Sequence, residues 1–272
     1  MNNSTVTIEQ LDDHVWSFDD QQQNSFYVLE GSEKALVIDT GMAEKNIIPL
    51  IRQVTQKPLL LALTHAHIDH MYHCDEFSAI YLHEKDKQAW KWPLRQTMWF
   101  VARFLFHKTA KVHRMVTYSS LYDYDTISLG DIELKVLPCP GHTPGSVLFV
   151  DDQHQLIFSG DALGSGAGVF LWMPGCLSIS SYHKALTSLL LKLKGKEHYR
   201  FLGGHRYQGK PYSTRPDAFV LGIDLVKDMS TLCEMILQNK ITPAAKIKKL
   251  GFQILWFHYE SAGIAVTKGK IK

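Results

Sequence analysis

THAHIDH, residues 64–70, decides how this chain is read, because it holds three histidines and one aspartate within seven residues. The apolar run 57–63 comes directly before it and predicts a buried strand, so these polar side chains stand on a turn at a strand end. Imidazole and carboxylate groups are zinc ligands, and His65 and His67 can share one side of an extended turn. The other reading is a polar loop that caps a helix, but protonated imidazoles so close together would repel one another. We therefore predict a metal site.

Three further candidate ligands follow later strands. His142 lies in PGHTPGS, residues 140–146, where proline and glycine fix a tight turn. Asp161 follows one predicted apolar strand in SGD, and His205 follows another in GGH. Each of them alone would be an ordinary loop residue. Since all three stand where a short apolar strand gives way to glycine, we expect them to meet the residues of 64–70 at one edge of the fold.

In this order, the motifs resemble those of the metallo-β-lactamase superfamily over residues 15–207. The resemblance implies an α+β fold, a four-layer αββα sandwich with a two-metal site between its sheet edges. It also implies hydrolysis by a metal-bridging hydroxide, with zinc as the expected metal and manganese or iron as alternatives. In the family's arrangement the first metal takes His65, His67 and His142, the second takes Asp69, His70 and His205, and Asp161 bridges both.

Two aspartates carry further expectations. Asp69, at the edge of the metals, is the predicted catalytic residue, which accepts or relays the proton of the hydroxide. Asp39 matches an acid that, in the family, supports the site by orienting ligands. Its alternative role is that of a turn-forming aspartate before Thr40 and Gly41.

The chain departs from the family pattern after residue 70. Many members carry two glycines there, whereas this chain has MYHC, residues 71–74. We interpret His73 as pocket lining or surface and Cys74 as a buried thiol. The flavodiiron branch usually carries glutamate at the position of His67, so an oxygen-reducing di-iron role is disfavoured.

The second and third motifs are 72 residues apart (142 − 70), and we assign this long gap to an aromatic-rich helical insertion at 84–122. The stretch 94–107 has only a narrow polar stripe, so its helix needs apolar partners on nearly every side. This helix has three possible roles: it packs in the core, it forms a dimer interface, or it forms a lid over the metals. We favour the lid, because the insertion begins soon after the ligand loop.

We treat residues 1–272 as a single domain, because no flexible linker divides them. The first forty residues predict a meander of strands. ALVIDTG at 35–41 and QLIFSGD at 155–161 are similar, which makes a duplicated unit plausible. A C-terminal extension at 214–272 is expected to hold a long helix to about Gln238, a short helix, and a hairpin of 252–258 with 264–267.

The overall composition excludes several classes of protein and of partner. The chain has 45% apolar and 21% charged residues and a formal net charge of +2, so it is globular and predicts no nucleic-acid partner. Its longest uncharged stretch, 162–182, is interrupted by glycines and serines and is not a membrane helix. No signal peptide is visible and the four cysteines form no CxxC pair, so free thiols and a cytoplasmic location are expected.

The favoured function is a dinuclear-metal hydrolase that cuts an ester, thioester or lactone with an apolar part. The alternatives are a phosphodiesterase or nuclease of the same fold, which would need a basic groove, and an iron-dependent oxidoreductase. The expected partner is a small-molecule substrate, and no association with a membrane is expected. A homodimer is possible. The glycines of 164–168 are read as a flexible loop rather than a phosphate cradle, and Tyr207 as a packing residue rather than a substrate contact.

Overall fold

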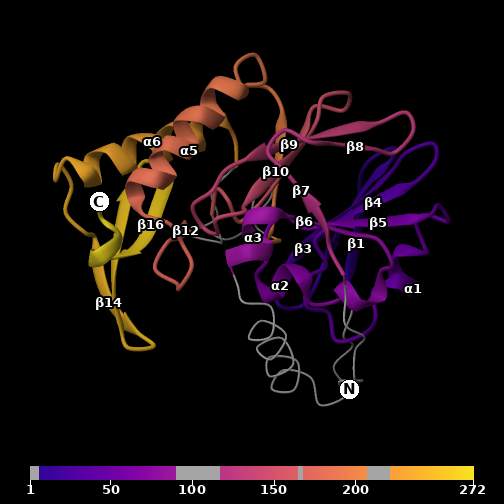
Figure 1. Cartoon of the computed structure of the whole chain (residues 1–272), viewed down its shortest axis with the longest axis horizontal. Coiled ribbons are helices and arrows are strands. Elements are labelled where there is room, and N and C mark those ends of the chain that lie inside the picture. Colours follow the sequence, from indigo (N-terminus) through magenta and orange to yellow (C-terminus); the bar gives the residue numbers. More distant parts are fainter. Residues whose placement is uncertain (1–5, 90–116, 165–167, 207–220) are drawn as a thin grey trace.

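Two β-sheets packed face to face form the centre of the molecule (Figure 1). The structure is a computed structural model that describes residues 6–89, 117–164, 168–206 and 221–272. Seven strands form the first sheet in the order of the sequence: β1 (Thr7–Asp12), β2 (Val15–Asp19), β3 (Ser25–Glu30), β4 (Ala35–Ile38), β5 (Leu59–Ala62), β6 (Ile80–His83) and β7 (Ser119–Leu121). The first four form the predicted antiparallel meander, and the last three join in parallel.

Five strands form the second sheet, in the order β13-β11-β10-β9-β8. They are β8 (Thr126–Ser128), β9 (Glu133–Pro138), β10 (Val147–Asp151), β11 (Leu156–Gly160) and β13 (Arg200–Gly203). Neighbouring strands are antiparallel except β11 and β13, which run in parallel. Parallel neighbours need a crossover, and here the crossover contains α5 (Ile179–Lys192).

Side chains that alternate along each strand fill both faces of these sheets. On β4, Leu36 and Ile38 pack between the two sheets, whereas Val37 packs on the outer face. On β10, Phe149 points between the sheets and Leu148 points outward. Burial on both faces explains why the sequence shows these strands as continuous apolar runs, and each large side chain buried in this way contributes about 1.5–3 kcal/mol.

Helices cover the outer faces of both sheets. The short helices α1 (Ile48–Ile51) and α2 (Ile68–Met71) pack on the first sheet. α5 and α6 (Ile223–Leu237) lie side by side and pack in one cluster with the outer face of the second sheet (Figure 1). The order helix, sheet, sheet, helix confirms the predicted αββα sandwich. No helix in the described part of the chain is long and apolar enough to cross a membrane.

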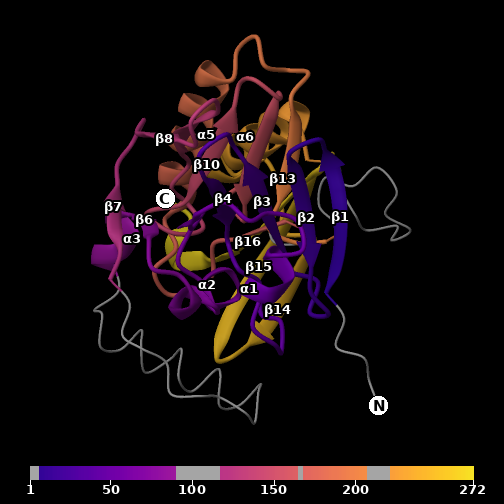
Figure 2. The ribbon, with the colours of Figure 1, turned by 90° about the vertical axis from the view of Figure 1, so that its right-hand side faces the viewer.

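A third sheet follows the sandwich and was only partly predicted. Its order is β12 (Val169–Phe170), β16 (Ala262–Thr267), β15 (Phe252–Tyr259) and β14 (Ala245–Lys249). The predicted hairpin is present as β15 and β16, but the short helix expected before it is wrong, because that segment is β14. β14 pairs with β15 along its whole length, and this pairing outweighs the helical preference of alanine and lysine. The β14–β15 hairpin extends away from α5 and α6 (Figure 2).

The predicted insertion at 84–122 begins and ends in elements of the fold. Helix α3 (Glu84–Ala89) follows β6 directly, and β7 closes the segment as the edge strand of the first sheet. Since β6 and β7 are parallel, the chain between them is a crossover that this pairing requires. The aromatic stretch from Trp90 to Phe106 lies outside the described residues, so the lid stays a prediction.

Hydrogen bonds join the two sheets where β13 ends. The amide of Ser25 donates to the carbonyl of Gly204 at 2.9 Å, and the amide of Arg206 donates to the carbonyl of Gln23 at 2.7 Å. The hydroxyl of Tyr27 donates to the carbonyl of Gly203 at 2.6 Å. The segment that carries His205 is therefore held by β3 of the first sheet as well as by its own strand.

Candidate metal centre

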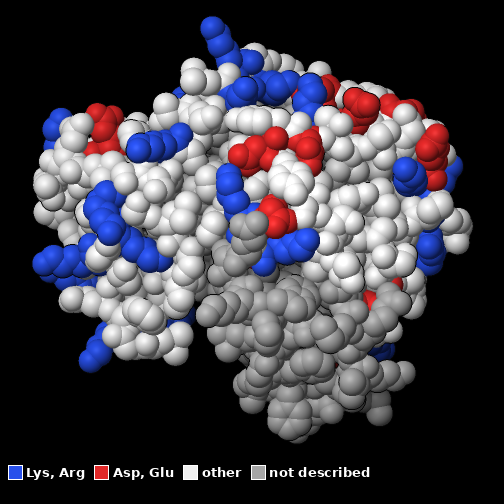
Figure 3. Space-filling view, in the orientation of Figure 1, with Lys and Arg blue, Asp and Glu red and all other residues white. Residues whose placement is uncertain are grey.

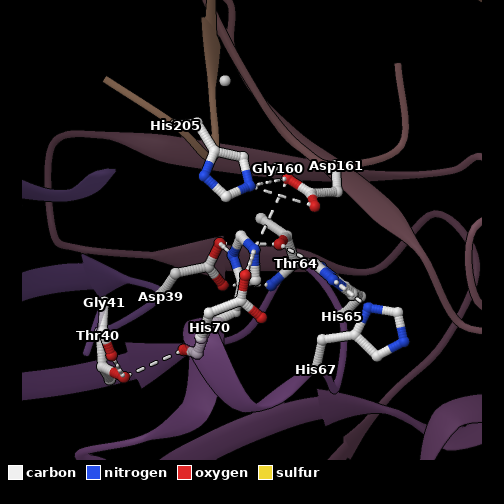
Figure 4. A network of polar contacts seen from close by, with 12 residues as sticks. Asp39, Thr40, Gly41, Thr64, His65, His67, His70, Gly160, Asp161 and His205 are labelled. Carbon is white, nitrogen blue, oxygen red and sulfur yellow. Dashed lines mark hydrogen bonds and ion pairs between the residues drawn. The ribbon is translucent and has the colours of Figure 1, made fainter. Parts of the chain in front are cut away.

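The seven predicted ligands lie on α2 and on loops that meet at one edge of the sandwich, and Figure 4 labels five of them: His65, His67, His70, Asp161 and His205. Four of them follow β5 within residues 65–70, and His142 lies in the loop between β9 and β10. Asp161 directly follows β11, and His205 follows β13. The structure divides them into two groups whose possible ligand atoms lie within 4.8 Å of one another: His65, His67 and His142, and Asp69, His70, Asp161 and His205.

The first group, which we call the three-histidine group, brings three ring nitrogens together. His67 Nδ1 lies 3.2 Å from His65 Nε2 and 2.8 Å from His142 Nε2. The hydroxyl of Thr64 donates to Asp39, so at 3.1 Å it accepts the proton of His65 Nδ1. His65 Nε2 therefore carries a lone pair directed at the centre of the group.

His142 is held in the same way by a backbone group. Its Nδ1 donates to the carbonyl of Phe170 at 2.9 Å, which leaves a lone pair on Nε2. Two lone pairs then face His67 Nδ1, and a single proton on that nitrogen can satisfy only one of them. A cation at the centre satisfies all three nitrogens, so the group fits a metal ion.

The second group, which we call the acid-containing group, surrounds a buried nitrogen that makes no hydrogen bond. His70 Nδ1 donates to Asp39 Oδ2 at 2.8 Å, so in the neutral ring Nε2 carries a lone pair. Among the described residues this Nε2 has no hydrogen-bonding partner, and it faces Asp161 Oδ1 at 3.5 Å and Asp69 Oδ2 at 3.7 Å. A lone pair that faces carboxylate oxygens is unfavourable unless a proton or a metal ion lies between them.

Asp161 lies between the two groups. Its Oδ1 is 3.3 Å from His205 Nε2, and its Oδ2 is 3.6 Å from His142 Nε2. Two ligands that bind one zinc ion at about 2 Å with tetrahedral angles are about 3.3 Å apart, so these spacings suit shared ions better than direct hydrogen bonds. The carboxylate therefore reaches toward both ion positions, as a bridging ligand requires.

The two groups hold protons differently. Burial, together with the neighbouring His70 and His67, lowers the pKa of His65 well below its usual value. Burial also lowers the pKa of His142, although Asp161 opposes this shift. His65 and His142 are therefore neutral and ready to bind a cation at neutral pH.

In the acid-containing group the carboxylates determine the direction in which the pKa of His70 shifts. Burial works against protonation of His70, yet the charges of Asp69 and Asp161 raise the pKa of His70 well above its usual value. Burial would raise the pKa of Asp161, but His205 and His70 hold it well below the usual range. Asp161 therefore stays ionised, and a cation that binds in this group displaces the proton of His70.

Asp39 acts through its neighbours, as the resemblance implies. Its Oδ1 accepts the amide of Thr64 at 2.8 Å and its Oδ2 accepts the Thr64 hydroxyl at 2.7 Å, next to the bond from His70. Its backbone has a φ of 63°, a conformation that few non-glycine residues adopt. One buried carboxylate therefore fixes the ring of His70 and, through Thr64, the ring of His65.

Sequence reasoning missed Asp86, which is fully buried on α3. Its carboxylate accepts the amide of Ala66 at 2.9 Å, the amide of Gly145 at 2.7 Å and the hydroxyl of Thr143 at 2.8 Å. Ala66 lies between two ligands and Thr143 follows His142, so Asp86 joins the two loops that form the three-histidine group. In the sequence it stands in EKDKQ, which reads as a solvated helix face and gives no signal.

Gly204 sets the close packing around the acid-containing group. A Cβ at this position would lie 2.5 Å from His70 Cε1 and 2.6 Å from Asp161 Oδ1. Any side chain there would displace two predicted ligands, which is why the strand before His205 ends in glycine.

Other predicted residues lie elsewhere. The interpretation of His73 as pocket lining or surface is wrong, because His73 is buried and bonds Glu76 Oε1 at 2.7 Å and the carbonyl of Ala43 at 2.9 Å. Cys74 is a buried thiol as predicted, and all four cysteines are free. Tyr207 and the centre of the glycine-rich loop, 165–167, lie outside the described residues.

Comparisons with known proteins agree with this geometry. A family model described as the metallo-beta-lactamase superfamily matches residues 19–205, which include all seven predicted ligands. The acyl-coenzyme A thioesterase MBLAC2 of Homo sapiens is 26% identical over 172 residues, which cover 55% of this chain and 61% of that protein. The chain thus spans about three fifths of the length of these thioesterase relatives. The probable metallo-hydrolase YqgX of Bacillus subtilis is 29% identical over 196 residues, covering 67% of this chain and 85% of that protein.

Solved structures show the same fold. TTHA1623 in a di-iron-bound form has 25% identity and a TM-score of 0.54, and the match covers 74% of this chain and 91% of that one. The metallo-beta-lactamase DIM-1 has 17% identity and a TM-score of 0.56, with 85% and 97% covered, and this likeness concerns the fold alone. The names of these relatives, a thioesterase and a probable metallo-hydrolase, agree with the expected metal-dependent hydrolase. Because the family model spans most of the chain and every predicted ligand, the chain belongs to the metallo-β-lactamase superfamily.

Proposed function

We propose that this chain is a hydrolase with two divalent metal ions that cuts thioesters of apolar acyl groups. The observation that carries the proposal is the position of Asp161 between two ligand groups, each with lone pairs directed at a common centre. The thioester is favoured over the ester and the lactone because the thioesterase MBLAC2 is among the relatives.

Two ions held in this place would lower the pKa of a bound water and polarise a carbonyl oxygen. The chain's own residues prepare the site for that chemistry. Asp39 and the carbonyl of Phe170 fix the rings of His70 and His142, so the Nε2 atoms cannot turn away. Ligands that are already oriented make no rearrangement during the reaction.

Asp69 is the proposed proton acceptor. It has 28% of its side chain exposed, whereas Asp161 and His70 are almost fully buried. Its Oδ2 lies 3.7 Å from His70 Nε2, at the open side of the acid-containing group. A carboxylate in this position can take a proton from an attacking water and pass it to solvent or to the leaving thiolate.

Zinc is the proposed metal for the three-histidine group, because imidazole nitrogens at tetrahedral spacing suit it. The relative TTHA1623 was solved in a di-iron-bound form, which makes iron the first alternative. Manganese is a further alternative, favoured by the two carboxylates of the second group.

The proposal is tested by loading the purified chain with zinc, iron or manganese, measuring metal per chain, and assaying matched thioester, ester, lactone, phosphodiester and β-lactam substrates. We expect two metals per chain and the highest kcat/KM for the thioester. Asp123→Asn is a matched control, because Asp123 also bonds a histidine, His83 Nε2 at 2.9 Å, but outside both ligand groups. Less than one metal per chain, or a preference for the phosphodiester, would contradict the proposal.

A further inference from the structure

One face of the third sheet carries a row of aromatic side chains. Phe170, Ala265, Trp256 and Ala245 are direct neighbours across its four strands. Ile254 and Phe252 continue the same face along β15, because residues two apart in a strand point to the same side. Trp172 packs against this row, with its ring 6.0 Å from that of Phe252. We call these side chains the aromatic face: Phe170, Trp172, Phe252, Ile254, Trp256 and Ala265.

The aromatic face begins at the metal centre. The carbonyl of Phe170 accepts the Nδ1 proton of His142 at 2.9 Å, so the first aromatic residue of the row also orients a predicted ligand. The ring of Phe170 meets that of Trp256 edge to face at 6.5 Å. From Phe170 on β12, the row crosses β16 to Trp256 on β15, a distance of about 10 Å for two strand spacings. It then follows β15 from Trp256 to Phe252, a further distance of about 13 Å.

The opposite face of the third sheet has a different role. Val169, Ile264 and Val266 point to that side and pack in the cluster of α5 and α6, where they are fully buried. The aromatic face keeps exposed surface at Phe170 and Trp256, which are half-buried, and at Phe252, which is 39% exposed, whereas Trp172, Ile254 and Ala265 are buried beneath them. It is therefore the apolar side of this sheet that a ligand can reach.

One basic side chain, that of Lys249, lies at the far end of the aromatic face. Lys249 pairs with Phe252 in the β14–β15 ladder, and its Nζ lies 6.0 Å from the centre of the Trp172 ring. Of the lysines on β14 only Lys249 shares this face, because Lys246 and Lys248 alternate with it and point to the opposite face; residues 239–259 contain no acidic residue. Lysines spread over the lobe that the third sheet forms, with few acids among them (Figure 3). This end of the sheet therefore attracts anions.

We propose that the aromatic face binds the thiol part of a coenzyme A thioester, with the thioester at the metals, the apolar arm over Phe170 and Trp256, and the phosphates near Lys249. This inference rests on the proposed function and names the substrate class within it. An arm that starts at a carbonyl and ends in phosphates matches a row that starts at His142 and ends at Lys249. β14, β15 and β16 lie beyond the family match of residues 19–205, whereas Phe170 and Trp172 lie inside it.

The test compares an acyl-coenzyme A with the acyl-pantetheine thioester of the same acyl group, which lacks the phosphates. We expect Lys249→Glu to raise KM for the coenzyme A substrate about fivefold, the upper range for one exposed charge pair, and to leave KM for the pantetheine substrate unchanged. Salt should weaken only the coenzyme A substrate, because exposed charges are screened. Lys184→Glu, on the exposed side of α5, is the matched control and should change neither.

A second measurement needs no turnover. Titration with a non-hydrolysable acyl-coenzyme A thioether should quench tryptophan fluorescence, and Trp256→Ala should weaken binding severalfold while metal content stays at the wild-type level. Equal turnover of both thioesters, or a Lys249→Glu effect on both, would overturn this inference and leave the thioesterase proposal intact. If neither thioester is cut, the proposed function fails, and the thioether titration alone decides the inference: no binding, or binding that Lys249→Glu leaves unchanged, would overturn it.

Discussion

The three-histidine group and the acid-containing group lie next to each other and share the loop after β5, yet they hold protons in opposite ways. Burial lowers the pKa values of His65 and His142, whereas the carboxylates around His70 overcome burial and raise its pKa. The difference shows that the surroundings, more than the ligand type, decide whether an imidazole is ready for a cation. It also predicts different behaviour for the two ions, which the following experiments test.

The largest effect is expected for Asp161→Ala, because this carboxylate faces both groups. Loss of a residue that only supports a ligand costs about 10- to 100-fold in metal affinity, so the loss of Asp161 should cost more than that at both ions and remove turnover. Metal analysis and activity are measured on the same sample. Wild-type metal content in this variant would remove the bridging role.

Asp69→Asn should separate the two groups. The three-histidine group contains no atom of Asp69, so its ion should stay at wild-type occupancy. Turnover should fall about 100-fold or more, because an amide accepts no proton at neutral pH. Simultaneous loss of both ions would show that the groups are one unit rather than two.

Asp39→Asn and Asp86→Asn are matched changes that each act mainly on one group, because Asp39 bonds His70 directly and reaches His65 only through Thr64. Asp39 bonds His70, while Asp86 joins the two loops of the three-histidine group. Each substitution should weaken one ion about 10-fold, at the low end for residues that orient ligands, and Asp86→Asn should also lower stability by about 1–3 kcal/mol.

For both variants, the affinity for each of the two ions is measured by titration against a competing chelator. Thermal unfolding of the metal-free protein measures stability. The weaker ion in Asp39→Asn should be the one that Asp69→Asn also weakens, and Asp86→Asn should weaken the other. If both variants affect the same ion, the assignment of these two aspartates to different groups is wrong.

The effect of pH is expected to fall on one group only. In metal-free protein the raised pKa of His70 means that a proton occupies the acid-containing group, and metal must displace it. Affinity for that ion should therefore rise with pH, by at most about 10-fold per unit for each proton displaced, until the raised pKa is passed. The lowered pKa values of His65 and His142 leave the other ion nearly independent of pH above 6.5. Titrations at pH 6.5 and 8.5 measure both slopes, and equal slopes would contradict the comparison.

The same pKa shift has a consequence for stability. A proton that His70 binds more tightly in the folded than in the unfolded state stabilises the metal-free fold below the unfolded pKa of about 6.5. That stabilisation is lost as pH rises through the raised pKa. The melting temperature of metal-free protein should therefore fall as pH rises above 6.5, and this fall should be absent once metal is bound.

The sequence predicted the layers of the fold and the seven residues that the structure brings together, because both depend on local patterns. Apolar runs such as 57–63 and the glycines before Asp161 and His205 are visible in one dimension. β12 and β7 are strands of two and three residues whose partners are distant in sequence, so no local pattern marks them. Asp86 was missed for a related reason, since only the folded chain shows that backbone amides surround it.

The hydrogen bonds that tie the end of β13 to β3 link assembly of the site to assembly of the whole molecule. Four ligands come from the first sheet and three from the second, so neither half alone holds a complete group with its bridging carboxylate. Metal capture must therefore follow the docking of the two sheets, and the amides of Ser25 and Arg206 mark that step. Their protection in hydrogen exchange should appear together during refolding, and bound metal should slow their exchange more than it slows that of amides in β14.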